Sequence, residues 1–264
     1  MGSPKPPDRG SFWTSTNGLI ATITALVVAI TTLIGAVVAQ PRLAEWVGLS
    51  PTASPTPSSA GGSASAPRTK PEVGEKLLED NFDNPIAGKL EPSTDDPTHY
   101  TRGYIEGEYV IKILVPVSEW PYTPVADLPD RYSDASIAVT ARAVGDSAGQ
   151  YITLACRSQG ADSYYRLMVM PYNRTFVLMR WENGVMIELV PWQSSDAIRP
   201  DRASNRLELM CSGRTITVII NDRLVARKDD NVYSEGKMWI GAGLLEDSQG
   251  TAEVRFNDLI VTQR

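Results

Sequence analysis

Few residues of this chain could support acid–base or nucleophilic chemistry. Glu106 and Glu108 alternate as they would on one face of a strand, and two carboxyls about 5–5.5 Å apart can cleave a glycosidic bond. Gly107 separates them, however, both come at the start of a strand-like segment, and no longer E-x-D-x-x-E-like run occurs. The single histidine, His99, and two cysteines cannot complete a Ser-His-Asp, Cys-His or zinc-binding arrangement. The sequence therefore predicts no catalytic residues.

Aromatic and arginine side chains are better suited to binding. They gather in three successive strand-like segments, where a ring can stack on the C–H face of a sugar while a guanidinium hydrogen-bonds its hydroxyls. The residues that we predict to bind ligand are Arg157, Tyr164, Tyr165, Arg166, Arg180, Trp181 and Glu182. The alternative is structural, because Tyr and Trp also stabilise sheets by cross-strand packing and Arg on an open face is often only solvated.

Strand-like patterns occupy almost the whole region that would position these side chains. Windows of strand length alternate between apolar and polar residues or are continuously apolar, and turn signals such as Asn183-Gly184 and Ser212-Gly213 separate them. With no convincing long helix, about eleven strands predict an antiparallel sandwich. The predicted strands are residues 108–115, 135–144, 150–158, 163–170, 174–181, 184–192, 205–212, 214–221, 223–228, 237–245 and 252–262.

The two cysteines have the same alternation as the apolar residues of their strands. Cys156 follows Ile152 and Leu154, and Cys211 follows Leu207 and Leu209, so both sulfurs point to the core. A disulfide between them would stabilise the fold by roughly 4 kcal/mol in the loop-entropy model. Two separate buried thiols are the alternative.

Residues 19–39 have no charged side chain and match the length of one transmembrane helix. Trp13 and Trp46 flank this segment, as expected at the two membrane surfaces, and Pro41 follows it. A cleaved secretory signal or a buried core helix would be the alternatives, but the segment is longer than the usual apolar part of a signal and has no polar stripe.

The segments around this helix suggest a topology. Residues 1–18 would form a short tail that Lys5 and Arg9 keep in the cytoplasm, and residues 40–71 contain a linker rich in Pro, Ser and Ala that cannot fold alone. Residues 72–264 would then form one extracellular domain, where the oxidising environment favours a disulfide. We expect a single-pass protein of the cell membrane.

The outer domain is acidic. Residues 72–264 contain 29 Asp and Glu and 20 Lys and Arg, a net charge of about −9. Nucleic acid is therefore not expected as a partner, since binding the phosphate backbone normally requires a basic face.

Several segments of this domain resemble a known family. They are EDNFDNP at residues 79–85, GEYVI at 107–111, the run from Leu154 to Val169, NRLELMCSGRTITVIINDRLV at 205–225 and VRFNDLIV at 254–261. They are similar to concanavalin A-like lectin/glucanase jelly rolls, and more narrowly to a version found outside bacterial membranes and related to laminin G-like and 3-keto-disaccharide hydrolase domains. The resemblance implies an all-β antiparallel jelly roll whose members bind glycans, cleave them or contact proteins.

Calcium is the only cofactor that the sequence suggests. Asp80, Asn81, Asp83 and Asp258 would bring hard oxygen ligands together if the first and last strands pair, and calcium is similarly placed in some related jelly rolls. The alternative is that these side chains cap turns.

Taken together, these features predict a membrane-anchored extracellular module that recognises carbohydrate or another cell-envelope ligand without catalysis. A glycoside-processing hydrolase and a surface that binds protein partners are the alternatives. An exposed face lined with aromatic residues would favour glycan binding, two carboxyls at hydrolase distance the enzyme, and a broad apolar patch the protein partner.

Overall fold

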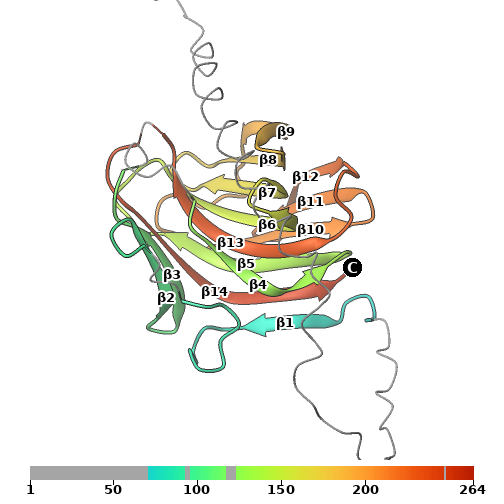
Figure 1. Cartoon of the computed structure of the whole chain (residues 1–264). Helices are drawn as coiled ribbons and strands as arrows, with labels where there is room; N and C mark the ends of the chain where they lie inside the picture. Colours follow the sequence, from blue (N-terminus) through green and yellow to red (C-terminus); the bar gives the residue numbers. More distant parts are fainter. Residues whose placement is uncertain (1–70, 93–95, 117–122, 247) are drawn as a thin grey trace, which may run out of the picture. The chain divides into compact units, whose positions relative to one another are not determined.

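The computed structural model of the chain describes residues 71–92, 96–116, 123–246 and 248–264. All regular structure in these ranges is β, and every strand pairing is antiparallel (Figure 1). Among the residues described, no helix is long and apolar enough to cross a membrane. The predicted tail (1–18), transmembrane helix (19–39) and linker (40–71) lie almost entirely outside these ranges.

The strands form two sheets. The order in the eight-stranded sheet is β12-β11-β10-β5-β14-β3-β2, with β1 pairing to β14, and the order in the six-stranded sheet is β4-β13-β6-β7-β8-β9. The first sheet contains β1 (Lys76–Asp80), β2 (Tyr100–Ile105), β3 (Glu108–Ile113), β5 (Ala135–Ala143), β10 (Asn205–Ser212), β11 (Thr215–Ile220), β12 (Arg223–Asp229) and β14 (Ala252–Gln263). The second contains β4 (Val125–Tyr132), β6 (Gln150–Gly160), β7 (Ser163–Met170), β8 (Thr175–Glu182), β9 (Val185–Ser194) and β13 (Gly236–Leu244).

The core lies between the two sheets and is built from alternate residues of each strand. On β6 the inward set is Ile152, Leu154 and Cys156, and on β10 it is Leu207, Leu209 and Cys211, as predicted. A bulge in β14 preserves this arrangement where strict alternation would fail. Asp258 takes a positive φ of 51°, which shifts the inward set from Phe256 to Leu259 and keeps both side chains buried.

All eleven predicted strands are present, and their ends agree to within about two residues. Three further strands, β1, β2 and β4, were not among the predicted windows. β4 contains Pro129 and three charged residues, which argue against a strand, but it lies at the edge of its sheet, where a proline need not donate a hydrogen bond. The pairing of the first strand with the last, on which the calcium hypothesis depended, is confirmed by β1 and β14.

The predicted disulfide is present. Cys156 of β6 and Cys211 of β10 are bonded, with Cα atoms 6.7 Å apart, so the link joins one sheet to the other across the core. Because both sulfurs lie in the core, the bond fixes the face that β6 and β10 each present to the core.

Replacing both cysteines with alanine should lower the free energy of unfolding by about 4 kcal/mol, because the unfolded chain regains the entropy that the closed loop removes. Urea denaturation of the full-length chain would measure this. The wild type in reductant should approach the double variant, and equal stability of the oxidised wild type and the variant would contradict the prediction.

Candidate ligand-binding site

The face of the six-stranded sheet that points away from the core carries a cluster of aromatic and hydroxyl side chains. Alternation along β6, β7, β8 and β13 places these residues outward, opposite the core set. We call this surface the outer face. Its central members are Tyr151 and Thr153 of β6, Tyr164 and Arg166 of β7, Trp181 of β8, Trp239 of β13, and Thr123, which precedes β4.

Arg166 is the centre of the outer face. Its Nε donates to Thr153 Oγ1 at 2.9 Å, and its Nη2 donates to Thr123 Oγ1 and Tyr151 OH, each at 3.2 Å. Thr153 in turn donates to the Leu167 carbonyl at 2.8 Å, and the hydroxyls of Thr123 and Tyr151 lie 2.9 Å apart. The guanidinium is therefore held in one orientation by a small network of neutral oxygens.

Aromatic rings surround this guanidinium. Its carbon lies 5.3 Å from the ring centre of Tyr151 and 5.8 Å from that of Trp239, within cation–π range. Tyr164 packs edge-on to Trp239 with ring centres 5.3 Å apart, and it lies parallel to Trp181 with centres 6.3 Å apart. Burial raises the pKa of the Tyr164 hydroxyl, and the neighbouring Arg166 opposes this shift.

Small residues make room for this cluster. A Cβ on Gly243 would lie 2.0 Å from the Tyr151 ring, and one on Gly241 would lie 3.0 Å from Thr153. Ala155 separates Trp239 from Arg166 in the strand register, so the indole can reach over the alanine to the guanidinium. The glycines of β13 therefore have a packing role, although their sequence context alone did not indicate it.

Three of the predicted ligand-binding residues, Tyr164, Arg166 and Trp181, lie together on the outer face. The other four do not. Tyr165 points into the core, and its hydroxyl donates to Asp230 at 2.6 Å. Arg180 and Glu182 lie on the same side of the sheet as Tyr165, because Arg180 pairs with Tyr165 across β7 and β8. Arg180 forms ion pairs with both Glu182 and Asp230. The predicted site combined residues that are adjacent in sequence, but adjacent residues of a strand point to opposite faces of the sheet.

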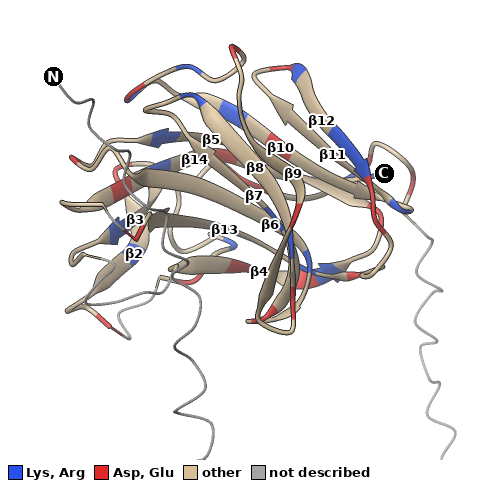
Figure 2. Ribbon diagram, turned by 90° about the horizontal axis from the view of Figure 1, so that it is seen from above, with Lys and Arg blue, Asp and Glu red and all other residues tan. Residues whose placement is uncertain are grey.

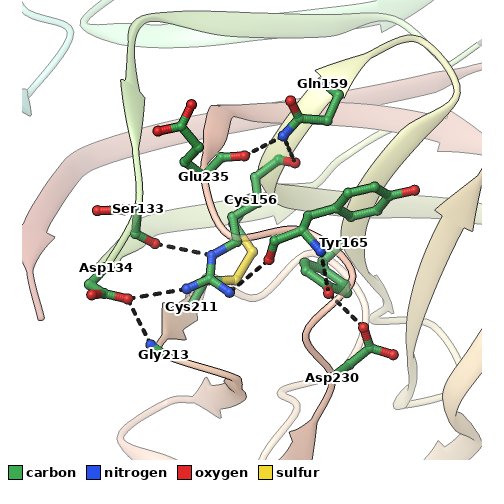
Figure 3. Close-up of a disulfide and its surroundings, with 11 residues drawn as sticks. Ser133, Asp134, Cys156, Gln159, Tyr165, Cys211, Gly213, Asp230 and Glu235 are labelled. Carbon is green, nitrogen blue, oxygen red and sulfur yellow. Dashed lines mark hydrogen bonds and ion pairs between the residues drawn. A yellow bond between two sulfur atoms is a disulfide. The ribbon is translucent and has the colours of Figure 1, made fainter.

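Arg157 is a structural residue that follows Cys156, whose disulfide with Cys211 is shown in Figure 3. It takes a positive φ of 53° at a bulge in β6 and is 1% exposed. Its guanidinium donates to the carbonyls of Ser133 and Tyr233, each at 3.0 Å, and to the Asp134 carboxylate at 3.2 Å. Burial lowers the pKa of Arg157, while the charge of Asp134 acts in the opposite direction.

The sequence analysis missed Tyr151, Thr153, Thr123 and Trp239. The first two lie on a strand that was predicted, and the outward parity that they share could have been deduced from the inward position of Cys156. Trp239 could be assigned only from the register between β13 and β6, which places it opposite Ala155.

Figure 2 marks the charged residues along the strands, and β7 contains one of them, Arg166. The strand register gives one row across the sheet, in the order Asp127, Trp239, Ala155, Arg166, Met179 and Glu188. At about 4.8 Å between strands, Asp127 and Glu188 are roughly 24 Å apart.

The other residues considered for catalysis lie elsewhere. Glu106 is in the turn between β2 and β3, and Glu108 accepts from Arg142 at 2.7 Å on the outward side of the eight-stranded sheet. Both glutamates also pair with Arg255. His99 contacts Asp96 at 2.6 Å in the loop before β2. The two glutamates are therefore engaged in ion pairs with arginines.

The predicted calcium ligands are near the paired strands β1 and β14. The Asp80 carboxylate accepts from the backbone N–H groups of Phe82 and Lys89 and from the Tyr104 hydroxyl, at 2.9, 2.6 and 2.9 Å. Asn81 donates to Asp83 at 2.6 Å, and Asp258 forms the bulge of β14. Within the described ranges, no three His, Cys, Asp or Glu side chains are grouped so that they could hold a metal ion.

Two cavities lie outside the aromatic cluster of the outer face, and the second is also lined by Asp127, at the β4 edge of that face. One of about 310 Å³ is lined by Tyr172, Asp146, Gln150 and Arg202, among others, and one of about 270 Å³ by Lys89, Arg102 and Lys237, among others. Tyr172 is 63% exposed and is the aromatic residue of the first cavity. Tyr172 is therefore an exposed aromatic residue outside the outer face that can serve as a control.

Comparison with known proteins identifies the fold. The sequence matches no protein-family model and no curated protein sequence. A Bacillus subtilis protein of unknown function with a galectin-like fold is similar in structure, with 12% identity over 73% of this chain and 97% of that chain and a TM-score of 0.53. The β-glucanase of Bacillus licheniformis has 12% identity over 73% and 100%, also at 0.53, and a native glycosidic hydrolase has 10% over 70% and 94%, at 0.53. The domain therefore has the galectin-like jelly-roll fold of these proteins, which is the fold that the resemblance to concanavalin A-like domains implied.

Calcium binding at Asp80 stays a prediction from the sequence. The hydrogen bonds of Asp80 favour the alternative, in which this side chain caps a turn and binds no calcium. Because the chain's own donors already occupy both Asp80 oxygens, adding or chelating calcium should leave the melting temperature unchanged. Asp80→Asn should lower the melting temperature equally with and without calcium, since it weakens the same hydrogen bonds. A calcium-dependent rise in the wild type that Asp83→Ala abolishes would establish the metal site instead.

Proposed function

We propose that this domain recognises carbohydrate through its outer face. The observation that supports this most directly is the composition of the face, where the partly exposed ring of Trp181 lies beside three buried aromatic rings and a fixed guanidinium. A sugar presents an apolar C–H face and a rim of hydroxyls, and it therefore needs an aromatic surface beside directed hydrogen-bonding groups.

The arrangement is also rigid in the way that binding sites need to be. Arg166 is fixed by three hydrogen bonds, and its hydroxyl partners are themselves bonded, so little side-chain entropy would be lost when a ligand binds. Trp181, at the rim of the cluster, is partly exposed and can offer its ring to a ligand. The β-glucanase and the glycosidic hydrolase that share the fold act on carbohydrate, which agrees with this proposal.

Binding without hydrolysis is the form of this function that we favour. Glycoside hydrolysis requires two carboxyls about 5–9.5 Å apart, whereas Asp127 and Glu188 lie at opposite edges of the sheet. Their separation supports a recognition role for the outer face.

Loss of the Trp181 ring should weaken binding. Trp181→Ala in the full-length chain should lower the affinity for bound oligosaccharides at least about tenfold, because one stacking surface is removed. A glycan array followed by calorimetry would measure this. Tyr172→Ala is the control, since it removes an exposed ring outside the outer face. If Tyr172→Ala abolishes binding and Trp181→Ala does not, the ligand binds in the 310 Å³ cavity and the proposed site is wrong.

We also propose that residues 19–39 anchor the domain outside the cell membrane. The charge-free length of this segment and the linker that follows it support this proposal. The chain should stay with the membrane after alkaline extraction, and protease added to intact cells should release residues 72–264. Recovery of the chain in the soluble fraction would contradict the anchor.

A further inference from the structure

We infer that the ligand of the outer face carries a negative charge, so that the site selects an acidic glycan with a uronate carboxylate or a sulfate ester over a neutral one. This inference rests on the proposed carbohydrate function and specifies its ligand class. It derives from the position of Arg166, a cation that the described part of the chain leaves without a carboxylate partner.

Two arginines of the described residues are more than nine-tenths buried, and they differ in their partners. Arg157 is 1% exposed and is paired with Asp134 at 3.2 Å. Arg166 is 7% exposed, and all of its hydrogen-bond partners are neutral hydroxyl oxygens. Burying a charge is costly unless an opposite charge or well-placed hydrogen bonds compensate, and for Arg166 only the second kind of compensation is present.

The strand register shows which side chains of the described residues lie beside Arg166. Its direct neighbours in the row are Ala155 and Met179. Glu188 is two strands away and Asp127 three, roughly 10 and 14 Å between backbones, and neither is paired with Arg166. The hydroxyls and π faces offset part of the desolvation cost, but they leave the positive charge unneutralised.

An anionic sugar would supply the missing charge. Its ring could lie against the partly exposed Trp181 while its carboxylate or sulfate approaches the guanidinium of Arg166, which is 7% exposed. A hydrogen bond with an ionised donor or acceptor is about twice as strong as a neutral one. The domain's net charge of about −9 does not prevent this, because at physiological ionic strength charges more than about 8 Å apart are largely screened.

The first test varies the ligand and leaves the protein unchanged. Oligogalacturonate should bind the full-length chain at least about tenfold more tightly than its methyl ester, which has the same sugar backbone without the charge. A κ-carrageenan oligosaccharide and its desulfated form make the same comparison for sulfate. The pair with the larger ratio identifies which anionic group the site accepts.

The second test supplies the counter-ion from the protein. Met179→Glu places a carboxylate directly opposite Arg166 on the neighbouring strand, where cross-strand Cβ atoms are about 5 Å apart. The preference for the anionic ligand should then fall to a ratio near one. Met179→Gln is the matched control, with the same shape and no charge, and should retain the preference. Arg166→Gln should also bring the ratio near one, and Arg166→Lys should reduce it.

The outcomes separate this inference from the proposed function. If charged and neutral ligands bind equally and Trp181→Ala weakens both, the carbohydrate function holds and the inference is wrong. If Met179→Glu and Met179→Gln have the same preference as the wild type, Arg166 does not meet the anion and the inference is also wrong. If no oligosaccharide binds, or if Trp181→Ala has no effect on binding, the proposed site itself is wrong.

Discussion

The alternation of side chains along β6 and β7 is the constraint on which both the core and the candidate site depend. A slip of one residue in β7 would exchange Tyr165, Leu167 and Val169 with Tyr164, Arg166 and Met168, placing a guanidinium in the core. The disulfide fixes the facing of β6, the strand with which β7 pairs, because Cys156 is bonded inward to Cys211 and its neighbours on β6 must alternate from that position. The outward positions of Tyr151 and Thr153 on β6 therefore follow from a bond on the opposite side of the sheet.

The two most buried arginines show how position decides the role of a side chain. Arg157 lies at a bulge, where its positive φ turns the guanidinium towards backbone carbonyls and Asp134, and Gly236 permits the close approach of the neighbouring strand. Arg166 lies in regular strand among aromatic rings and hydroxyls. The first arginine is paired with a carboxylate of the fold, whereas the hydrogen-bond partners of the second are neutral hydroxyls.

The sequence was sufficient for most of the fold. Alternation and turn residues located eleven strands, and the parity of Cys156 and Cys211 predicted their bond. The strand β4 was missed because Pro129 is tolerated only at an edge, and edge position is a property of the assembled sheet. The candidate site was predicted in part, since Tyr164, Arg166 and Trp181 follow from local sequence, while Trp239 joins them only through the β13–β6 register.

The positions of the carboxylates on the outer face bear both on whether a bound sugar is cleaved and on which charge it carries. Among the described residues, Asp127 and Glu188 lie at opposite edges of the face, and Arg166 is paired with neither of them. A hydrolase needs carboxylates at the centre of its face, where they would also neutralise an arginine and repel an acidic sugar. Placing an arginine at that centre instead favours retention of an anionic ligand over its cleavage, so the proposed binding role and the proposed charge of the ligand derive from the same arrangement.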